Sequence, residues 1–362
     1  MKYSTEFRDR DLVEQISARM HRDFSHPARI MEVCGTHTMS VARFGLKSLL
    51  PAGVELVSGP GCPVCVTDQR DIDLFLALGR VSGVTLASFG DMLRVPGSVT
   101  SLEKLRAEGA DVRVVYSPLD AVEIAEKEPG GNVVFFGVGF ETTMPASAMA
   151  ITSAAELKLP NFSVFCVHKT MPAALRALFA GGSDISGLLL PGHVTTIIGA
   201  DAYTFLADEL GLPCAVTGFE PLDIMLGIES IMRQIETGAA IVDNVYARAV
   251  HREPNSHAAE LLREVFVPCD GLWRGLGMIP DSAVRISSEY ACFDARARFA
   301  DTLAAVAPAA ESRCGCGDVL RGVIGPSQCA FFGSGCTPEE PLGPCMVSTE
   351  GACAAAYIYG GL

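Results

Sequence analysis

The stretch ARIMEVCGTHT (residues 28–38) joins a short, largely apolar run with little polar alternation to a loop of small and polar residues. An apolar run without polar alternation is typical of a strand buried on both faces, as in parallel sheets. Seven similar runs follow, and stretches with helical periodicity separate many of them. This alternation predicts an α/β fold with parallel sheets covered by helices. The eight runs span residues 28–34, 54–59, 84–90, 111–117, 132–140, 161–167, 186–192 and 213–219.

Eight strands in about 190 residues favour two doubly wound domains over one large sheet. We place the division near EKEPGGN (125–131), a charged connector that contains Gly and Pro, although the chain can cross between the domains more than once. A smaller C-terminal domain is expected where Gly, Pro and Cys become frequent. The predicted parts are an N-terminal helical extension (1–27), a first α/β domain (28–127), a second (128–240) and the C-terminal domain (241–362).

Charge and hydropathy exclude several classes of function. The chain of 362 residues has 28 basic and 42 acidic side chains, a formal charge of −14, and no run of Lys or Arg. Nucleic-acid binding is therefore not expected, because phosphate contacts need clustered positive charge. We see no signal-peptide pattern and no apolar stretch long enough for a membrane span, and we expect a cytoplasmic protein. Thiols stay reduced there, so the thirteen cysteines do not predict a disulfide framework.

Small and chemically active residues follow six of the eight strands. In an open parallel sheet, ligands bind beyond the carboxyl ends of the strands, so these loops are expected to line a cleft. The loops are MEVCGTHT, SGPGCPVC, SFGDMLRVPG, GVGFETT, PGHVTT and TGFEP.

Cys34 and His37 lie in the first of these loops. A thiol near a helix N-terminus has a lowered pKa, so Cys34 is a candidate nucleophile or metal ligand; the alternative is a buried structural cysteine. His37 can act as a proton donor, a base or a second ligand.

Cys62 and Cys65 form a Cys-x-x-Cys pair at a predicted strand–helix junction. Such a pair supports reversible disulfide formation or metal binding. Together with Cys34 it supplies three thiolates and leaves one position open, which suits a reactive centre better than a structural zinc site. Thiolates are soft donors for iron, zinc or cuprous copper.

Four residues in two other loops are candidates for lining the cleft: Glu141, Thr142, Thr143 and His193. The glycines before Glu141 do not have the G-x-G-x-x-G spacing of a dinucleotide site. The alternative role for Glu141 and the threonines is to cap a helix start, and for His193 a satisfied structural position.

Six cysteines lie between Cys314 and Cys353. A [4Fe–4S] cluster needs four thiolates, and a surplus pair beside it would make a redox relay. Spacing makes Cys314 the least favoured ligand, so four of the remaining five are expected to hold the cluster; zinc is the rival metal. Glu350 either lies on the surface or reaches the cleft. The five candidates are Cys316, Cys329, Cys336, Cys345 and Cys353.

Six motifs in this order resemble the HypD family of hydrogenase maturation factors, and the resemblance covers essentially the whole chain. All the cysteine positions of the motifs are present. The motifs are CGTHT (34–38), GPGCPVC (59–65), GFETT (139–143), PGHVTT (191–196), TGFEP (217–221) and FGSGCTPEEPLGPCMVSTEGAC (332–353).

The resemblance implies an assembly scaffold that works with the small chaperone HypC. On it the Fe(CN)2CO unit of [NiFe]-hydrogenases is built, with cyanide delivered by HypE, which is supplied by HypF. It also implies two α/β domains, a third domain with a [4Fe–4S] cluster, and redox activity in cyanide attachment. The residues implied as essential are Cys34, His37, Cys62, Cys65 and Glu350.

Two other functions fit the residues. The first is an iron–sulfur-dependent thiol–disulfide oxidoreductase, suggested by the Cys-x-x-Cys pair and the C-terminal cysteines. The second is a zinc-stabilised α/β binding protein.

Overall fold

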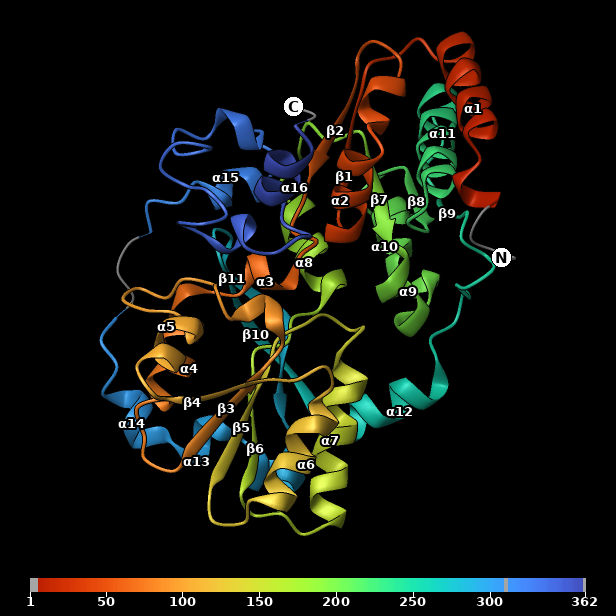
Figure 1. Cartoon of the computed structure of the whole chain (residues 1–362). Coiled ribbons are helices and arrows are strands. Elements are labelled where there is room, and N and C mark those ends of the chain that lie inside the picture. The colour runs from red at the N-terminus through yellow and green to blue at the C-terminus, as the bar shows by residue number, and fades with distance from the viewer. Residues whose placement is uncertain (1–5, 309–311, 361–362) are drawn as a thin grey trace.

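A computed structural model describes residues 6–308 and 312–360 of the chain (Figure 1). The eight predicted strands are confirmed, each inside its apolar run. Most of their residues are buried, as expected for strands with helices on both faces. The strands are β1 (Ala28–Glu32), β2 (Val54–Ser58), β3 (Val84–Ser88), β4 (Asp111–Val114), β5 (Asn132–Gly137), β6 (Phe162–Cys166), β7 (Gly187–Pro191) and β8 (Cys214–Thr217).

The strands form two parallel sheets. The first has the order β2-β1-β7-β8-β9, where β9 is Val242–Asn244, and the second has the order β4-β3-β5-β6. In both sheets the strand order reverses once, between β1 and β7 and between β3 and β5, and such reversal points are where doubly wound folds bind ligands. The α/β class and the two doubly wound sheets are therefore confirmed.

The sheets do not divide the chain near residues 125–131. Strands β3 and β4, which we expected beside β1, pair with β5 and β6, while β7 returns to pair with β1. The chain thus leaves the first sheet after β2 and re-enters it at β7. The connector EKEPGGN only joins α6 (Pro118–Lys127) to β5. Its charge and glycines are equally typical of an ordinary surface turn, so its composition could not locate the crossing.

Helices cover both sheets. The loops discussed below run from the end of a strand to the start of the helix that follows it. The long helix α11 (Pro221–Thr237) packs against α1 (Arg10–Asp23), where Arg19 and Glu229 form an ion pair at 2.8 Å. None of the helices in the described part of the chain is both long and apolar enough to cross a membrane. The other α-helices are α2 (Gly35–Arg43), α3 (Pro63–Val66), α4 (Gln69–Leu78), α5 (Leu102–Ala107), α7 (Met144–Glu156), α8 (Met171–Phe179), α9 (Gly192–Ile198), α10 (Thr204–Asp208), α12 (Ser256–Val265), α13 (Ala295–Arg298), α14 (Ala300–Ala304), α15 (Cys316–Leu320) and α16 (Ala352–Tyr359).

An antiparallel hairpin follows α12, made of β10 (Phe266–Trp273) and β11 (Gly277–Ile286). Trp273 in β10 is the only tryptophan of the sequence. It is fully buried, and its Nε1 donates to Ser282 Oγ at 2.7 Å. This pairing was not predicted, because Pro268 and an irregularity after Cys269 interrupt the alternation that marks a strand.

The turn of the hairpin contacts the segment that follows the Cys-x-x-Cys pair. The Arg274 backbone N–H donates to the Val66 carbonyl at 2.9 Å, and Arg274 Nε donates to the Thr67 carbonyl at 2.9 Å. The C-terminal segment lies beside the first sheet, where α16 packs against α2 (Figure 1). The hairpin and the C-terminal segment therefore both reach the carboxyl edge of the first sheet.

Candidate functional site

Two adjacent strands present the loops that carry Cys34 and Cys62 at the same edge of the first sheet. Cys34 follows β1 and occupies the N-cap position of α2. Cys62 follows β2 and occupies the N-cap position of α3, as predicted for a Cys-x-x-Cys pair that opens a helix. Since β1 and β2 are parallel neighbours, the two loops leave the sheet side by side.

The two loops touch backbone to backbone. The Gly35 N–H donates to the Gly61 carbonyl at 3.0 Å. A Cβ atom on Gly61 would lie 2.2 Å from the Cys34 backbone nitrogen and 2.4 Å from its Cα, distances that no side chain can tolerate. Glycine at both positions lets the Cys34 and Cys62 loops approach this closely.

Glu350 joins the site from the far end of the chain. A Cβ atom on Gly35 would lie 2.6 Å from Glu350 Cβ and 3.2 Å from Cys62 Cβ, so Gly35 separates these two residues. The Thr36 hydroxyl donates to Glu350 Oε1. Burial raises the pKa of Glu350, and Thr36 opposes the shift. Glu350 thus faces the Cys34 loop and can hold a proton there.

Cys62 and Cys65 are buried, free thiols whose sulfur atoms lie 2.7 Å apart. The Cys65 backbone N–H donates to Cys62 Sγ at 3.3 Å, and Cys62 Sγ lies 3.6 Å from Ser348 Oγ. The pair therefore needs little movement to interact with a shared partner or with each other.

Cys65 also contacts Cys345, which we predicted only as a cluster ligand. Burial, the Cys345 thiol and the Cys62 thiol together raise the pKa of Cys65 well above its ordinary value. Cys345 lies in the short 3-10 helix η7 (Pro344–Met346), which packs against α3. Three thiols from distant parts of the sequence thus form a continuous row, Cys62–Cys65–Cys345.

The Cys34 thiol is held in its neutral form. Burial raises the pKa of Cys34 to about 12, and the charge of Glu350 adds to the shift, while the backbone N–H groups of Thr36 and His37 oppose it. The lowered pKa expected at a helix N-terminus does not occur, because loss of solvation outweighs the helix dipole. Cys34 would become a thiolate on binding a metal ion, which displaces the proton.

His37 is fully buried behind Cys34. Its Nε2 lies 2.9 Å from the Gly218 carbonyl, so Nε2 carries the proton, and the buried Nδ1 has no hydrogen-bond partner among the described residues. Burial lowers the pKa of His37 to about 4. A neutral imidazole with a free lone pair can accept a proton or bind a metal ion.

Phe219 links the two histidines of the first sheet. The ring of His37 stacks on Phe219 at a centroid distance of 4.8 Å, and the exposed ring of His193 stacks on it at 3.8 Å. His193 therefore lies at the rim of the site and not in its centre. Phe219 was not singled out in the sequence, although it lies in the quoted motif TGFEP.

Glu141 lies at the end of β5 in the second sheet and is 4% exposed. Its Oε1 accepts from the Met171 N–H at 2.9 Å, so it caps α8 and not the helix that directly follows it. Its Oε2 is buried and accepts no hydrogen bond from any residue in 6–308 or 312–360, and burial raises the pKa of Glu141 to about 7. Thr143 precedes α7, but its hydroxyl donates to the Phe140 carbonyl; Thr142 is exposed.

The C-terminal cysteines gather round one apolar hollow. Cys314 lies there with the others, although spacing had made it the least favoured ligand. Cys345 does not line the hollow; it contacts Cys65 and also lies near Cys353, whose pKa it helps to raise. The lining thiols are those of Cys314, Cys316, Cys329, Cys336 and Cys353.

Thiols are the donors that iron–sulfur clusters use, so this donor set fits a [4Fe–4S] cluster by its chemistry. Within residues 6–308 and 312–360, however, no three His, Cys, Asp or Glu side chains are grouped closely enough to hold a metal ion as they stand. The thiols of the hollow, and those of Cys34, Cys62 and Cys65, would need side-chain rotation to close on a metal.

A groove of about 400 Å³ runs between the two sheets. One wall consists of the start of α3 with Ser348 and Glu350, and the other consists of the loops after β3, β4 and β5, including Asp91 and Thr143. The carboxyl edges of both sheets thus contribute to one groove, with the Cys-x-x-Cys helix between them.

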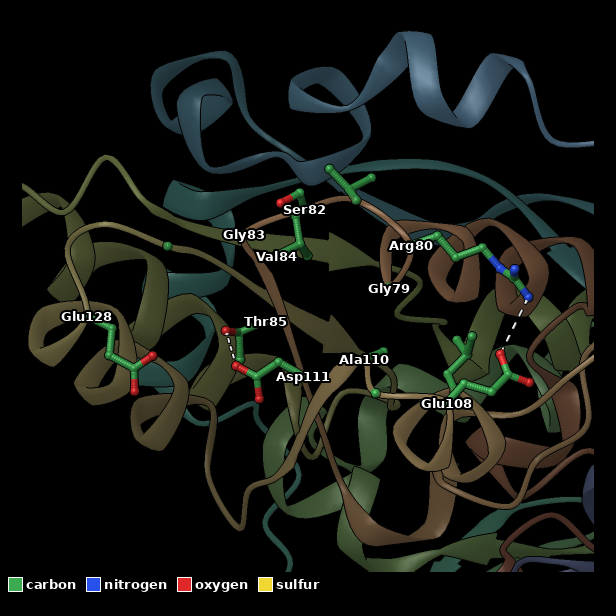
Figure 2. A pocket seen from close by; sticks show the side chains of 14 residues that line it. Gly79, Arg80, Ser82, Gly83, Val84, Thr85, Glu108, Ala110, Asp111 and Glu128 are labelled. Carbon is green, nitrogen blue, oxygen red and sulfur yellow. Dashed lines mark hydrogen bonds and ion pairs between the residues drawn. The ribbon is translucent and has the colours of Figure 1, made fainter.

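A larger hollow lies elsewhere in the described part of the chain. It measures about 610 Å³ and lies at the amino ends of β3, β4 and β5 (Figure 2). Its charged groups already have partners: Thr85 donates to Asp111 at 2.7 Å, and Arg80 lies 3.8 Å from Glu108. No Cys or His lines it, and ligands of such sheets bind at the opposite edge, so we do not assign it a function.

Comparison with known proteins places this chain in one family. The model of the family described as "HypD: Hydrogenase formation hypA family" matches residues 8–360. Three curated relatives named "Hydrogenase maturation factor HypD" align over the full length. The protein from Azotobacter vinelandii is 46% identical, and the alignment covers 99% of this chain and 97% of the relative. The protein from Rhodobacter capsulatus is 44% identical, with 100% of this chain and 99% of the relative covered. The protein from Escherichia coli K12 is 42% identical, with 99% of this chain and 98% of the relative covered.

We expect the substitution Gly35→Ala to open the site. The added Cβ would overlap Glu350 and force its segment away from Cys62, which is 4% exposed. Alkylation of Cys62 by iodoacetamide, followed by peptide mass spectrometry, should be faster by on the order of tenfold. Gly130→Ala is the matched control, because nothing lies within 4 Å of its Cβ position. Equal rates in the two variants would contradict the packing described here.

The pKa of His37 predicts a pH dependence of stability. Below about pH 6.5 the unfolded chain binds a proton that folded His37 does not accept until about pH 4, so His37 makes the fold less stable as the pH falls through this window. We expect the urea midpoint of His37→Gln to fall less between pH 7 and pH 5 than that of the wild type. Buried His168 keeps part of the slope in both. Exposed His251→Gln is the control; parallel slopes for wild type and His37→Gln would refute the assignment.

Proposed function

Because the chain belongs to the HypD family of hydrogenase maturation factors, we propose that it is the scaffold on which the Fe(CN)2CO unit of a [NiFe]-hydrogenase is assembled. Iron is the cargo of this scaffold and is held only until it is handed on. We further propose that a HypC-type chaperone shares the iron, and that HypE, supplied by HypF, delivers cyanide. The reduced thiols suit a cytoplasmic setting.

The observation that carries the proposal is the meeting of Cys34, Cys62 and Glu350 around Gly35. These three residues lie in separate segments of the chain and belong to no common helix or strand. The fold nevertheless brings them together at the carboxyl edge of the first sheet, beside the point where its strand order reverses. A half-buried carboxylate beside buried thiols is costly to place there without a function, since the carboxylate loses solvation and gains no cation in return. The groove beside them gives a partner protein access to the site.

Thiolates are suitable anchors for an iron that carries strong-field ligands. We propose that Cys34 is one ligand and that Cys62 or Cys65 supplies another. Each thiol loses its proton when iron binds, and Glu350 is the neighbouring carboxylate that can take up the Cys34 proton. His37, neutral and with a free Nδ1 lone pair, is a second acceptor or a ligand.

The C-terminal thiols are proposed to hold a [4Fe–4S] cluster, which would supply single electrons when bound. The row Cys345–Cys65–Cys62 leads from the C-terminal segment to the scaffold site. Cys62 and Cys65 can release two electrons and two protons by forming a disulfide with each other, and regain them on reduction. This chemistry matches the need to reduce a transferred thiocyanate-like group to cyanide.

A thiol–disulfide oxidoreductase is the second candidate, because the same row of thiols supports it. The burial of Cys62 and Cys65, 4% and 0% exposed, counts against attack on the disulfide of a separate protein. Turnover of an external protein disulfide that does not depend on Cys34 or His37 would favour this candidate over the scaffold.

The scaffold is tested by infrared spectroscopy of the protein purified anaerobically with its HypC-type partner. We expect bands in the cyanide and carbonyl stretching regions in the wild type and their loss in Cys34→Ala. The control is Cys292→Ala, an exposed cysteine outside the site. Bands of unchanged intensity in Cys34→Ala would refute the assignment of Cys34 as an iron anchor.

A second test separates the roles of the C-terminal cysteines. Since Cys345 faces Cys65 and not the hollow, we expect Cys345→Ala to keep the visible absorption of an iron–sulfur cluster and to lose reduction of an oxidised Cys62–Cys65 pair. The double substitution Cys329→Ala and Cys336→Ala, which leaves three thiols in the hollow, should abolish the absorption. Loss of the absorption in Cys345→Ala would instead make Cys345 a cluster ligand.

A further inference from the structure

A separate cavity of about 230 Å³ lies between the second sheet and the hairpin β10–β11. It is walled by the end of β6, by α4, by both strands of the hairpin and by the start of α13. None of the residues that we assign to the scaffold lines it. Its chemically active lining residues are Asp71, Cys166, Lys169, Cys269, Arg285 and Arg296.

Lys169 places a cation in this cavity without a hydrogen-bond partner. The residue is 3% exposed, and its nearest carboxylate oxygen, Asp71 Oδ2, is 3.9 Å from Nζ, beyond hydrogen-bond distance. Lys169 Nζ donates no hydrogen bond to any residue that the structure describes. Burial lowers the pKa of Lys169, and Asp71 only partly opposes this. A buried ammonium group that is not hydrogen-bonded is costly, so it indicates a missing partner.

Asp71 offers Lys169 only a long ion pair, because Arg296 is hydrogen-bonded to Oδ1 and the other oxygen, Oδ2, stays 3.9 Å from Lys169 Nζ. Arg296 donates to Asp71 Oδ1 at 2.6 Å, and its guanidinium group lies 4.2 Å from the centre of the Phe165 ring, which fixes its plane.

The other two acids of the cavity are also engaged. Asp294 accepts from the Arg296 backbone N–H as the N-cap of α13, and Asp270 accepts from the Asp281 backbone N–H at 3.2 Å. Arg285, on the exposed side of the hairpin, forms no side-chain hydrogen bond or ion pair with a described residue. One buried ammonium and one guanidinium therefore remain available at the same cavity.

We propose that this cavity binds a small oxyanion between Lys169 and Arg285. The Lys169 ammonium group would donate hydrogen bonds to the anion inside the cavity. The Arg285 guanidinium group would pair with the anion at the mouth, because its planar, forked donors match the oxygens of an oxyanion. The cavity volume admits an anion of a few heavy atoms and excludes a nucleotide. The site is distinct from the scaffold site and does not depend on the function proposed for it.

Binding there would tie the hairpin to the second sheet. Lys169 itself pairs with Ala283 of β11 in an isolated antiparallel bridge, and the turn of the same hairpin holds Val66 and Thr67, next to Cys65. A bound anion should therefore hold the hairpin in place, and the hairpin in turn holds the backbone at the end of the Cys-x-x-Cys helix.

Inorganic phosphate is the first probe, added to the full-length protein at constant ionic strength against chloride. We expect the thermal unfolding midpoint to rise with phosphate and to saturate in the wild type and in the exposed control Lys104→Met, but not in Lys169→Met. Acetate, in a parallel arm, shows whether the site prefers inorganic oxyanions or carboxylates. A rise that never saturates, or one equal in Lys169→Met, would be general salt stabilisation and would overturn the proposal.

Alkylation gives a second readout that does not depend on stability. Cys269 lines the cavity and is half-buried, whereas Cys292 is exposed and lies outside it. A saturating concentration of the anion should slow reaction of Cys269 with neutral iodoacetamide severalfold and leave Cys292 unchanged. If no anion protects Cys269 in the wild type, the cavity is not an anion site.

Discussion

The contact between Gly35 and Gly61 is the constraint on which the site depends. Their backbones are hydrogen-bonded at 3.0 Å, and neither position has room for a side chain. Because the two loops leave neighbouring parallel strands, this contact determines how closely Cys34 and Cys62 can approach. Glu350 then occupies the space that a side chain on Gly35 would fill. Two glycines thus create both the proximity of the thiols and the place for the carboxylate.

The burial that follows from this contact determines the chemistry. Cys34 and Cys65 are held as neutral thiols and His37 as a neutral imidazole, because each is removed from water. Thiols held in their neutral form are poor nucleophiles until they lose their protons. The groove beside the site is open to partners. A site of this kind suits a protein that holds a metal for a time and passes it on better than one that turns over free substrates.

Much of the fold could be predicted because parallel strands buried on both faces leave a largely apolar run with little polar alternation. All eight runs became strands, and the residues after them gather at the carboxyl edges. The division of the strands between the sheets could not be predicted, since strand pairing is a long-range property and residues 125–131 look like any surface turn. The hairpin was not predicted, because Pro268 and a register shift after Cys269 interrupt the alternation of apolar and polar residues that marks a strand.

By itself, the sequence determined the strands, the loops that carry Cys34, Cys62 and Cys65, and the supply of thiols near the C-terminus, because each is encoded in a few adjacent residues. The tertiary structure alone decided that Cys345 faces Cys65, that Cys314 joins the other C-terminal thiols, and that Lys169 is buried without a hydrogen bond. The physical reason is that contact partners and solvation depend on segments that are distant in the sequence and meet only in the folded chain. Spacing between cysteines along the chain carries no information about either.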